Sequence, residues 1–244
     1  MAEFHIKIAG CVASVRSLFD STPQYFRAYR TEEAADFSVA VQPEDLRFEQ
    51  AELDAEAAQE GFRRRQFTDP FLERTAIQRA FAEYLLAQNV LLVHGSAVAA
   101  DGKGYLFLAR SGTGKSTHTR LWREMLGQRA QMINDDKPFL AIGAEGVTIY
   151  GSPWSGKHGL DTNVAVPLAG ICLLERGETD QIWPITAEEI LPMLAKQTYQ
   201  SLDASEAGHT AVLVEQLAQL VPLWRMHCTP RSAAAQLAFQ TMAK

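Results

Sequence analysis

The sequence predicts an α/β fold that carries a phosphate-binding loop. Short apolar segments alternate with helical patterns from residue 90 onward, as expected of strands and helices that share one core. The segment 109–116 places glycines between an apolar run and a helical pattern, which is the context of a P-loop. Hydrophobic residues make up 47% of the 244 residues, enough for a sizeable buried core.

Residues 1–89 are expected to form a small α+β region. Apolar residues alternate with polar ones over 4–8 and again over 37–41, and each alternation predicts a strand. Helices are expected to begin at Thr22-Pro23 and to cover 49–61 and 69–88.

Residues 90–244 are expected to form the P-loop domain. An Asp-Gly pair at 101–102 separates two apolar runs and predicts a β-hairpin. Thr186 and Glu189 have the spacing of a capping box and predict the start of a helix. The expected strands are 90–93, 96–100, 105–109, 131–134, 139–142, 147–150, 168–174 and 223–227. The expected helices are 115–126, 186–199, 212–220 and 231–242.

Charge and cysteine usage exclude several classes of protein. The net charge of -6 argues against a general nucleic-acid surface or an anionic membrane surface, because both need clustered positive charge. Cys11, Cys172 and Cys228 are far apart, so neither a disulfide framework nor a thiolate zinc site is expected. No apolar stretch approaches the roughly 20 residues of a membrane helix. We therefore expect a cytoplasmic protein with no nucleic-acid or membrane partner.

The P-loop segment 109–116 predicts binding of ATP with Mg²⁺. Gly112 and Gly114 let the backbone curl so that successive N–H groups point at phosphate oxygens. Lys115 would place its charge on the β- and γ-phosphates, and the hydroxyl of Ser116 would bind magnesium. The expected nucleotide-binding residues are Ser111, Gly112, Thr113, Gly114, Lys115, Ser116, Thr117 and Lys157.

Two adjacent carboxylates, Asp135 and Asp136, follow the expected strand 131–134. One carboxylate in this position normally holds the metal, and a second can accept the proton of an incoming hydroxyl. We assign Asp135 mainly to magnesium, beside Ser116, and Asp136 mainly to the role of base. The swapped assignment and a solvated pair in a turn are the alternatives.

His94 and the segment 151–159 complete the candidate site. His94 stands at the end of the strand 90–93 and is either structural or in contact with the base or a phosphate, so it joins Asp135, Asp136 and Lys115 as a catalytic candidate. The segment 151–159 is rich in Gly and contains Trp, Lys and His, which is typical of a substrate or phosphate loop. In that loop Lys157 would add positive charge. A plain connector is the alternative.

Together these residues resemble the HPr serine kinase/phosphorylase family, which is related to phosphoenolpyruvate carboxykinase. The His-Gly pair at 94–95 is similar to the family's His-Gly after a strand, and 106–117 resembles its strand and phosphate loop. The Asn-Asp-Asp run at 134–136 resembles the family's paired aspartates, one of which serves as base towards the acceptor serine. The segment 151–156 resembles one that is common among small HPr-kinase-like proteins of bacterial gene clusters.

The resemblance implies a mixed sheet like that of HPr kinase and carboxykinase, and a kinase that phosphorylates a hydroxyl, with serine of a small protein or peptide as the expected acceptor. Two departures affect the substrate. The family's Arg-Gly-Leu-Gly segment, tied to phosphorylase activity and HPr recognition, is missing, since 169–172 lacks the Arg, and 1–89 does not resemble the family's N-terminal domain. Family members are oligomers, so a homo-oligomer is one state to test.

Three other functions use the same residues. A small-molecule kinase needs a closed pocket in place of an open groove. A non-catalytic nucleotide sensor would bind ATP without turnover, although it has less need of paired aspartates. A carboxykinase would need further residues for a second metal and for oxaloacetate, which the sequence does not identify.

Overall fold

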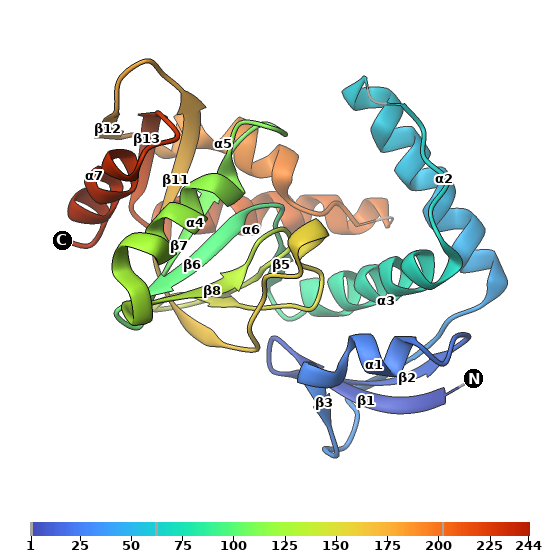
Figure 1. Ribbon diagram of the computed structural model, residues 1–244. Coiled ribbons are helices and arrows are strands. Elements are labelled where there is room, and N and C mark those ends of the chain that lie inside the picture. The colour runs from blue at the N-terminus through green and yellow to red at the C-terminus, as the bar shows by residue number, and fades with distance from the viewer. Residues whose placement is uncertain (1, 62, 202) are drawn as a thin grey trace. The chain divides into compact units, whose positions relative to one another are not determined.

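The chain forms two compact units, Met1–Tyr84 and Leu85–Lys244, shown in Figure 1. The computed structural model describes residues 2–61, 63–201 and 203–244. No helix among these residues is long and apolar enough to cross a membrane.

The first unit combines a four-stranded sheet of order β3-β1-β2-β4 with helices, as the α+β prediction expects. β1 and β2 form a tight hairpin in which Ala9 and Gly10 adopt positive φ angles of 50° and 85°. The unit contains β1 (Ala2–Ile8), β2 (Cys11–Ser17), α1 (Thr22–Tyr25), β3 (Arg30–Thr31), β4 (Phe37–Ala40), α2 (Pro43–Glu60) and most of α3 (Asp69–Leu86).

Two elements of the first unit differ from the sequence prediction. β2 was not predicted, because Val12 and Ala13 are both buried and break the alternation that marks a half-buried strand. α2 begins at Pro43, where the prediction expected only the end of a strand, since Pro also suits the first turn of a helix. Asp45 closes a capping box there, and its carboxylate accepts a hydrogen bond from the N–H of Gln42 at 2.8 Å.

The second unit is built on a nine-stranded mixed sheet, which agrees with the predicted fold class at the level of a mixed α/β protein. Its main path runs β5-β9-β10-β11-β7-β6-β8, and β13 pairs with both β11 and β12. The strands are β5 (Val90–Leu92), β6 (Ser96–Ala100), β7 (Lys103–Leu108), β8 (Ala130–Asn134), β9 (Phe139–Gly143), β10 (Gly146–Tyr150), β11 (Ala165–Arg176), β12 (Gln181–Pro184) and β13 (Leu223–Cys228). The helices are α4 (Lys115–Leu126), α5 (Ala187–Gln197), α6 (Ala207–Leu220) and α7 (Ser232–Met242).

The sheet branches at β11, its longest strand. The first residues of β11 pair with β10, and the last ones, from Ile171 to Arg176, pair with β13 on the same side. On its other side β11 runs parallel to β7, with Leu173 opposite Leu108. The prediction placed a strand only at 168–174, because polar or exposed residues at both ends of β11 hide its full length.

Helices cover both faces of this sheet, and the strand alternation decides which side chains meet which helices (Figure 1). On β7, Leu106 and Leu108 pack with residues of α5 and α6. Tyr105 and Phe107 point the other way and pack with α4 and α7, where Trp122 is fully buried. Since each strand of the sheet centre contributes apolar side chains to both cores, the strands read as continuous apolar runs.

Two predictions from short sequence patterns in the second unit, a hairpin turn and a capping box, are confirmed. Asp101 and Gly102 have φ angles of 50° and 79°, as a two-residue hairpin turn between β6 and β7 requires. The capping box at the start of α5 is present, with Glu189 accepting the N–H of Thr186 at 3.0 Å.

Candidate functional site

Four strands bring the predicted site residues to one edge of the sheet. β6 is antiparallel to β7 and β8, so its first residues lie beside their last ones; Ser96 pairs with Phe107. β11 is parallel to β7 and ends near the same place. We call this end of the four strands the site edge. His94, the loop 109–116, the Asp pair and Arg176 all leave the sheet there.

The loop 109–116 joins β7 to α4 and turns at two glycines. Gly112 and Gly114 adopt φ angles of 74° and 123°, a region that residues with a Cβ rarely occupy. α4 begins at Lys115, and no side chain caps its N-terminus. The helix dipole at this N-terminus favours a negatively charged ligand. The ammonium of Lys115 donates to the carbonyl of Ala109 at 3.3 Å, so it curls back over the loop.

Asp135 is buried and is connected by hydrogen bonds to α4. Its side chain is held by the hydroxyl of Ser96, which donates to Oδ1 at 2.6 Å, and only 7% of the residue is exposed. The hydroxyls of Ser96 and Thr119 lie 2.8 Å apart. Thr119 is one helical turn beyond Ser116, the predicted magnesium ligand. The carboxylate of Asp135 is thereby coupled to the helix that follows the loop.

Asp136 lies in a different environment, although it is the next residue. Its side chain is 32% exposed, and its Oδ1 is 3.2 Å from Nε2 of His94, which is 31% exposed. The backbone around it is held by Asn134, whose side-chain oxygen accepts the N–H groups of Asp136 and Lys137 at 2.7 Å and 2.6 Å. Asp135 is therefore buried, whereas Asp136 is accessible, and their assignment to metal and base stays a prediction.

Burial, with the positive charges of Lys137 and Lys115, lowers the pKa of His94 to about 2. The imidazole is therefore neutral near neutral pH, and a neutral ring can donate one N–H. Nε2 of His94 therefore faces the carboxylate of Asp136 as part of an uncharged ring, 3.2 Å from Oδ1, and the two residues do not form an ion pair near neutral pH. The predicted contact between His94 and the candidate base is present.

The segment 151–159 is anchored against the end of β8. Asn134 donates to the carbonyl of Ser152 at 2.7 Å, and the hydroxyl of Ser152 donates to the carbonyl of Lys137 at 2.6 Å. Gly156 has a φ of 67°, and a Cβ there would lie 3.2 Å from that of Asp136. Lys157 follows and is exposed, and within the described chain no hydrogen bond or ion pair joins it to the Asp pair. The segment touches the site through Gly156, and the nucleotide role of Lys157 stays a prediction.

Several residues at the site edge were not predicted. Ser96 was not singled out because it is simply the polar first residue of an apolar run. A hydroxyl at the start of a buried strand could nevertheless have indicated a site residue. Thr119 and Lys137 stand close to predicted residues in the chain. Arg176 gave no signal at all: its Nη2 donates to the carbonyl of Gly112 at 2.5 Å, across 64 positions of sequence.

The residues at the site edge fit Mg²⁺ better than a metal that needs a protein cage. Within the described residues there is no cluster of three or more His, Cys, Asp or Glu able to hold a metal. Magnesium bound with a nucleotide takes most of its ligands from phosphates and water, so it needs only one or two protein carboxylates. Asp135, oriented by Ser96, could supply one, and Ser116 on α4 could supply a hydroxyl.

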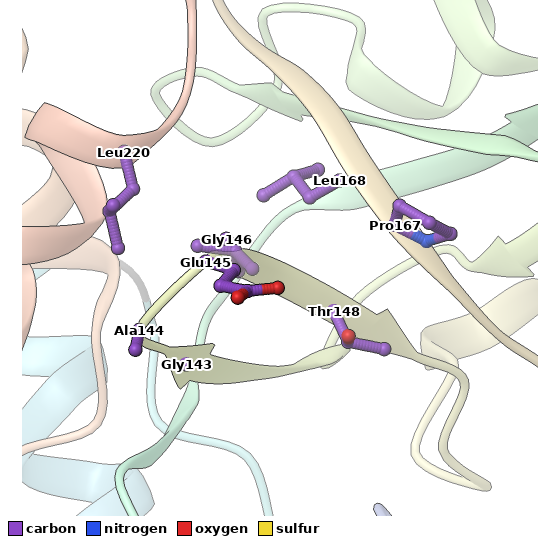
Figure 2. A pocket seen from close by; sticks show the side chains of 9 residues that line it. Gly143, Ala144, Glu145, Gly146, Thr148, Pro167, Leu168 and Leu220 are labelled. Atoms are coloured by element: carbon purple, nitrogen blue, oxygen red, sulfur yellow. The ribbon is translucent and has the colours of Figure 1, made fainter.

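A pocket of ≈ 660 Å³ lies elsewhere, at the point where β11 passes from β10 to β13 (Figure 2). Its lining includes Glu145 and Thr148 of the β9–β10 hairpin, Leu168 of β11 and Leu220 of α6. Leu168 pairs with Gly104 at the start of β7, whereas the loop 109–116 follows the end of β7. This branch pocket is therefore separate from the site edge.

Comparison with known proteins gives matches only among solved structures. No family model matches the chain, and no curated protein matches it. Among solved structures, the HPr(Ser) kinase/phosphatase from Coxiella burnetii is similar at 11% identity and a TM-score of 0.34, over 63% of this chain and 99% of that one. At these values the likeness is a remote one of fold, and the geometry of the site edge has to carry any functional conclusion.

Proposed function

We propose that this chain is an ATP- and magnesium-dependent kinase that transfers the γ-phosphate to a hydroxyl, with serine of a small protein or peptide as the acceptor. The observation that carries the proposal is the pairing of an accessible Asp136 with a neutral His94, 3.2 Å apart, beside an uncapped helix N-terminus. A candidate base, a neutral imidazole and a helix N-terminus that suits an anion would then act together at one sheet edge.

The loop 109–116 and α4 would bind the polyphosphate. The N–H of Gly114 and those at the start of α4 suit phosphate oxygens, and Lys115 adds a point charge. The hydroxyl of Ser116 and the carboxylate of Asp135 would hold the magnesium ion, which would neutralise charge on the β- and γ-phosphates. The buried hydrogen bond from Ser96 supports this role, because it orients Asp135 without exposing it.

Asp136 would act as the base. The acceptor oxygen forms a bond to the γ-phosphorus, the bond from that phosphorus to the bridging oxygen of ATP breaks, and the acceptor proton passes to Asp136. Nε2 of His94 lies 3.2 Å from Oδ1 of Asp136, so the imidazole would help to orient the carboxylate that takes the proton. A Cβ at position 156 would stand 3.2 Å from that of Asp136, so a side chain there would crowd this residue.

The identity of the acceptor rests on the sequence resemblance to HPr serine kinases and on the exposure of Asp136. We extend the proposal to a carboxykinase-like domain, a cytoplasmic protein and an acceptor that is neither nucleic acid nor lipid. A homo-oligomer is compatible with it. The first unit, Met1–Tyr84, carries none of the proposed chemistry.

The proposal is tested by incubating the protein with γ-labelled ATP, Mg²⁺ and an array of serine-containing peptides and small proteins. We expect Asp136→Asn to lower transfer by about 10³-fold, because an amide cannot accept the proton, and to change ATP affinity by less than about threefold. Tight ATP binding with no transfer by the wild type would support a sensor instead. Transfer that is unchanged in Asp136→Asn would contradict the assignment of the base.

A further inference from the structure

Arg176 is the last residue of β11 and plays no part in the chemistry proposed above. Its side chain reaches the loop 109–116 because β11 and β7 run parallel and end together, with Leu173 opposite Leu108. Nη2 of Arg176 donates to the carbonyl of Gly112 at 2.5 Å, and Nε donates to that of Thr113 at 3.5 Å. The guanidinium thus spans two successive carbonyls, a task that suits its planar fork.

The two carbonyls determine how the loop presents its N–H groups. In a trans peptide the C=O and the N–H of the same unit point in opposite directions. Holding the carbonyl of Thr113 on the side of Arg176 therefore turns the N–H of Gly114 to the other side. The N–H of Thr113 likewise points away and donates to the carbonyl of Arg110 at 3.1 Å.

Glycine makes the loop conformation accessible but does not hold it. Gly112 and Gly114 stand at φ angles of 74° and 123°, and glycine has the largest number of other backbone states. A loop with a glycine at both of these positions needs an external restraint to keep its N–H groups aligned before a ligand arrives. Arg176 supplies such a restraint from a strand that the sheet core holds in place.

We propose that Arg176 is a positioning residue that keeps the loop 109–116 in its anion-binding conformation before the polyphosphate binds. The inference rests on the proposed function in taking ATP as the ligand. Since the guanidinium has five N–H donors, it can hold both carbonyls and still offer donors and charge towards a phosphate. Arg176 is exposed, so its removal affects the loop and not the core.

The experiment measures the affinity of Mg-ATP and of Mg-pyrophosphate by calorimetry for the wild type, Arg176→Gln and Arg176→Lys. We expect both variants to bind both ligands about tenfold more weakly, because lysine keeps the charge but cannot span two carbonyls. The melting temperature should stay within about 2 °C of the wild type. Arg120→Gln is the matched control: Arg120 is exposed on α4 and pairs with Glu124 at 2.5 Å, and its loss should change affinity by less than about twofold.

The outcomes separate this inference from the proposed function. If the wild type binds neither Mg-ATP nor Mg-pyrophosphate, the proposed function fails. If the wild type binds them and Arg176→Gln binds equally well, only the positioning role is wrong. Wild-type affinity in Arg176→Lys would show that only the positive charge matters. A loss of affinity confined to Mg-ATP would show that Arg176 contacts the nucleoside. Either result would overturn the inference.

Discussion

The site edge and the branch pocket of the same sheet are organised in different ways. At the site edge, buried polar groups are hydrogen-bonded to one another: Asp135 to Ser96, Ser96 to Thr119, and Asn134 to Ser152. The branch pocket is lined mainly by glycine and apolar residues, and Glu145 is its one charged residue among those that the structure describes. The branch pocket therefore offers few groups for chemistry.

The difference follows from how each region arises. The branch pocket is the gap left where β10 ends its pairing with β11 and β13 takes over, so it is a consequence of strand geometry. The site edge buries polar groups, and removing such a group from water costs free energy unless it forms a hydrogen bond within the protein. A hydrogen-bonded polar cluster is thus the better guide to a reaction site in this chain than volume.

The largest expected effect concerns the stability of the protein at low pH, because a buried histidine lies on α4, beside the site edge, and none of the described residues that line the branch pocket is a histidine. His118 of α4 is buried behind the loop, its Nε2 accepts a hydrogen bond from Trp122 at 3.1 Å, and burial lowers its pKa from 6.5 to about 4. Below pH 6.5 the imidazole of His118 binds a proton in the unfolded chain, whereas in the folded chain it does so only below about pH 4. His118 should therefore contribute a fall of up to about 3 kcal/mol in the free energy of unfolding over this window as the pH decreases, and His94 adds a fall of the same sign.

Urea unfolding at a series of pH values checks this prediction. His118→Gln keeps an acceptor for Trp122 but does not titrate, so its stability should fall less than that of the wild type as the pH decreases. Parallel curves for the two proteins would show that His118 is not the group responsible.

Removing the hydroxyl of Ser96 is expected to give the next largest effect. Ser96→Ala takes away the hydrogen-bond donor that orients Asp135. Loss of a residue that hydrogen-bonds to a metal ligand typically lowers metal affinity by about tenfold or more. The measurement is the Mg²⁺ concentration needed for half-maximal ATP binding. Thr148→Val deletes a hydroxyl from the branch pocket and is the matched control, which should leave that concentration unchanged. Equal effects of the two variants would mean that Ser96 acts only on stability.

The smallest effect is expected for the charge in the branch pocket. Glu145→Gln should change ATP affinity and phosphate transfer by less than about twofold, because the hairpin turn that carries it has no hydrogen bond to the site edge among the described residues. A loss of tenfold or more in transfer would mean that the two regions are coupled, and the distinction between them would no longer hold.

The sequence was a good guide wherever a function needs contiguous residues. The glycines at 112 and 114 predicted the turn of the loop, and their positive φ angles agree. The Asp-Gly hairpin and the capping box at Thr186 were equally local. The strands of the sheet centre were found because they are buried on both faces and read as apolar runs.

Contacts between distant segments could not be predicted. Arg176 reaches the loop only because β11 and β7 are adjacent and in register, and no periodicity in either strand specifies that neighbour. The branching of the sheet at β11 was missed for the same reason, since one strand has to change partner along its length. The different environments of Asp135 and Asp136 depend on Ser96 and His94, which lie about 40 positions upstream.

A crystal structure with a non-hydrolysable ATP analogue and Mg²⁺ tests the central claim most directly. We predict that the phosphates lie on the N–H groups of residues 112–116, that the metal lies between Ser116 and Asp135, and that Asp136 faces an open side of the γ-phosphate. Phosphates bound in the branch pocket, or an Asp136 that is shut off from the γ-phosphate, would contradict the proposed kinase.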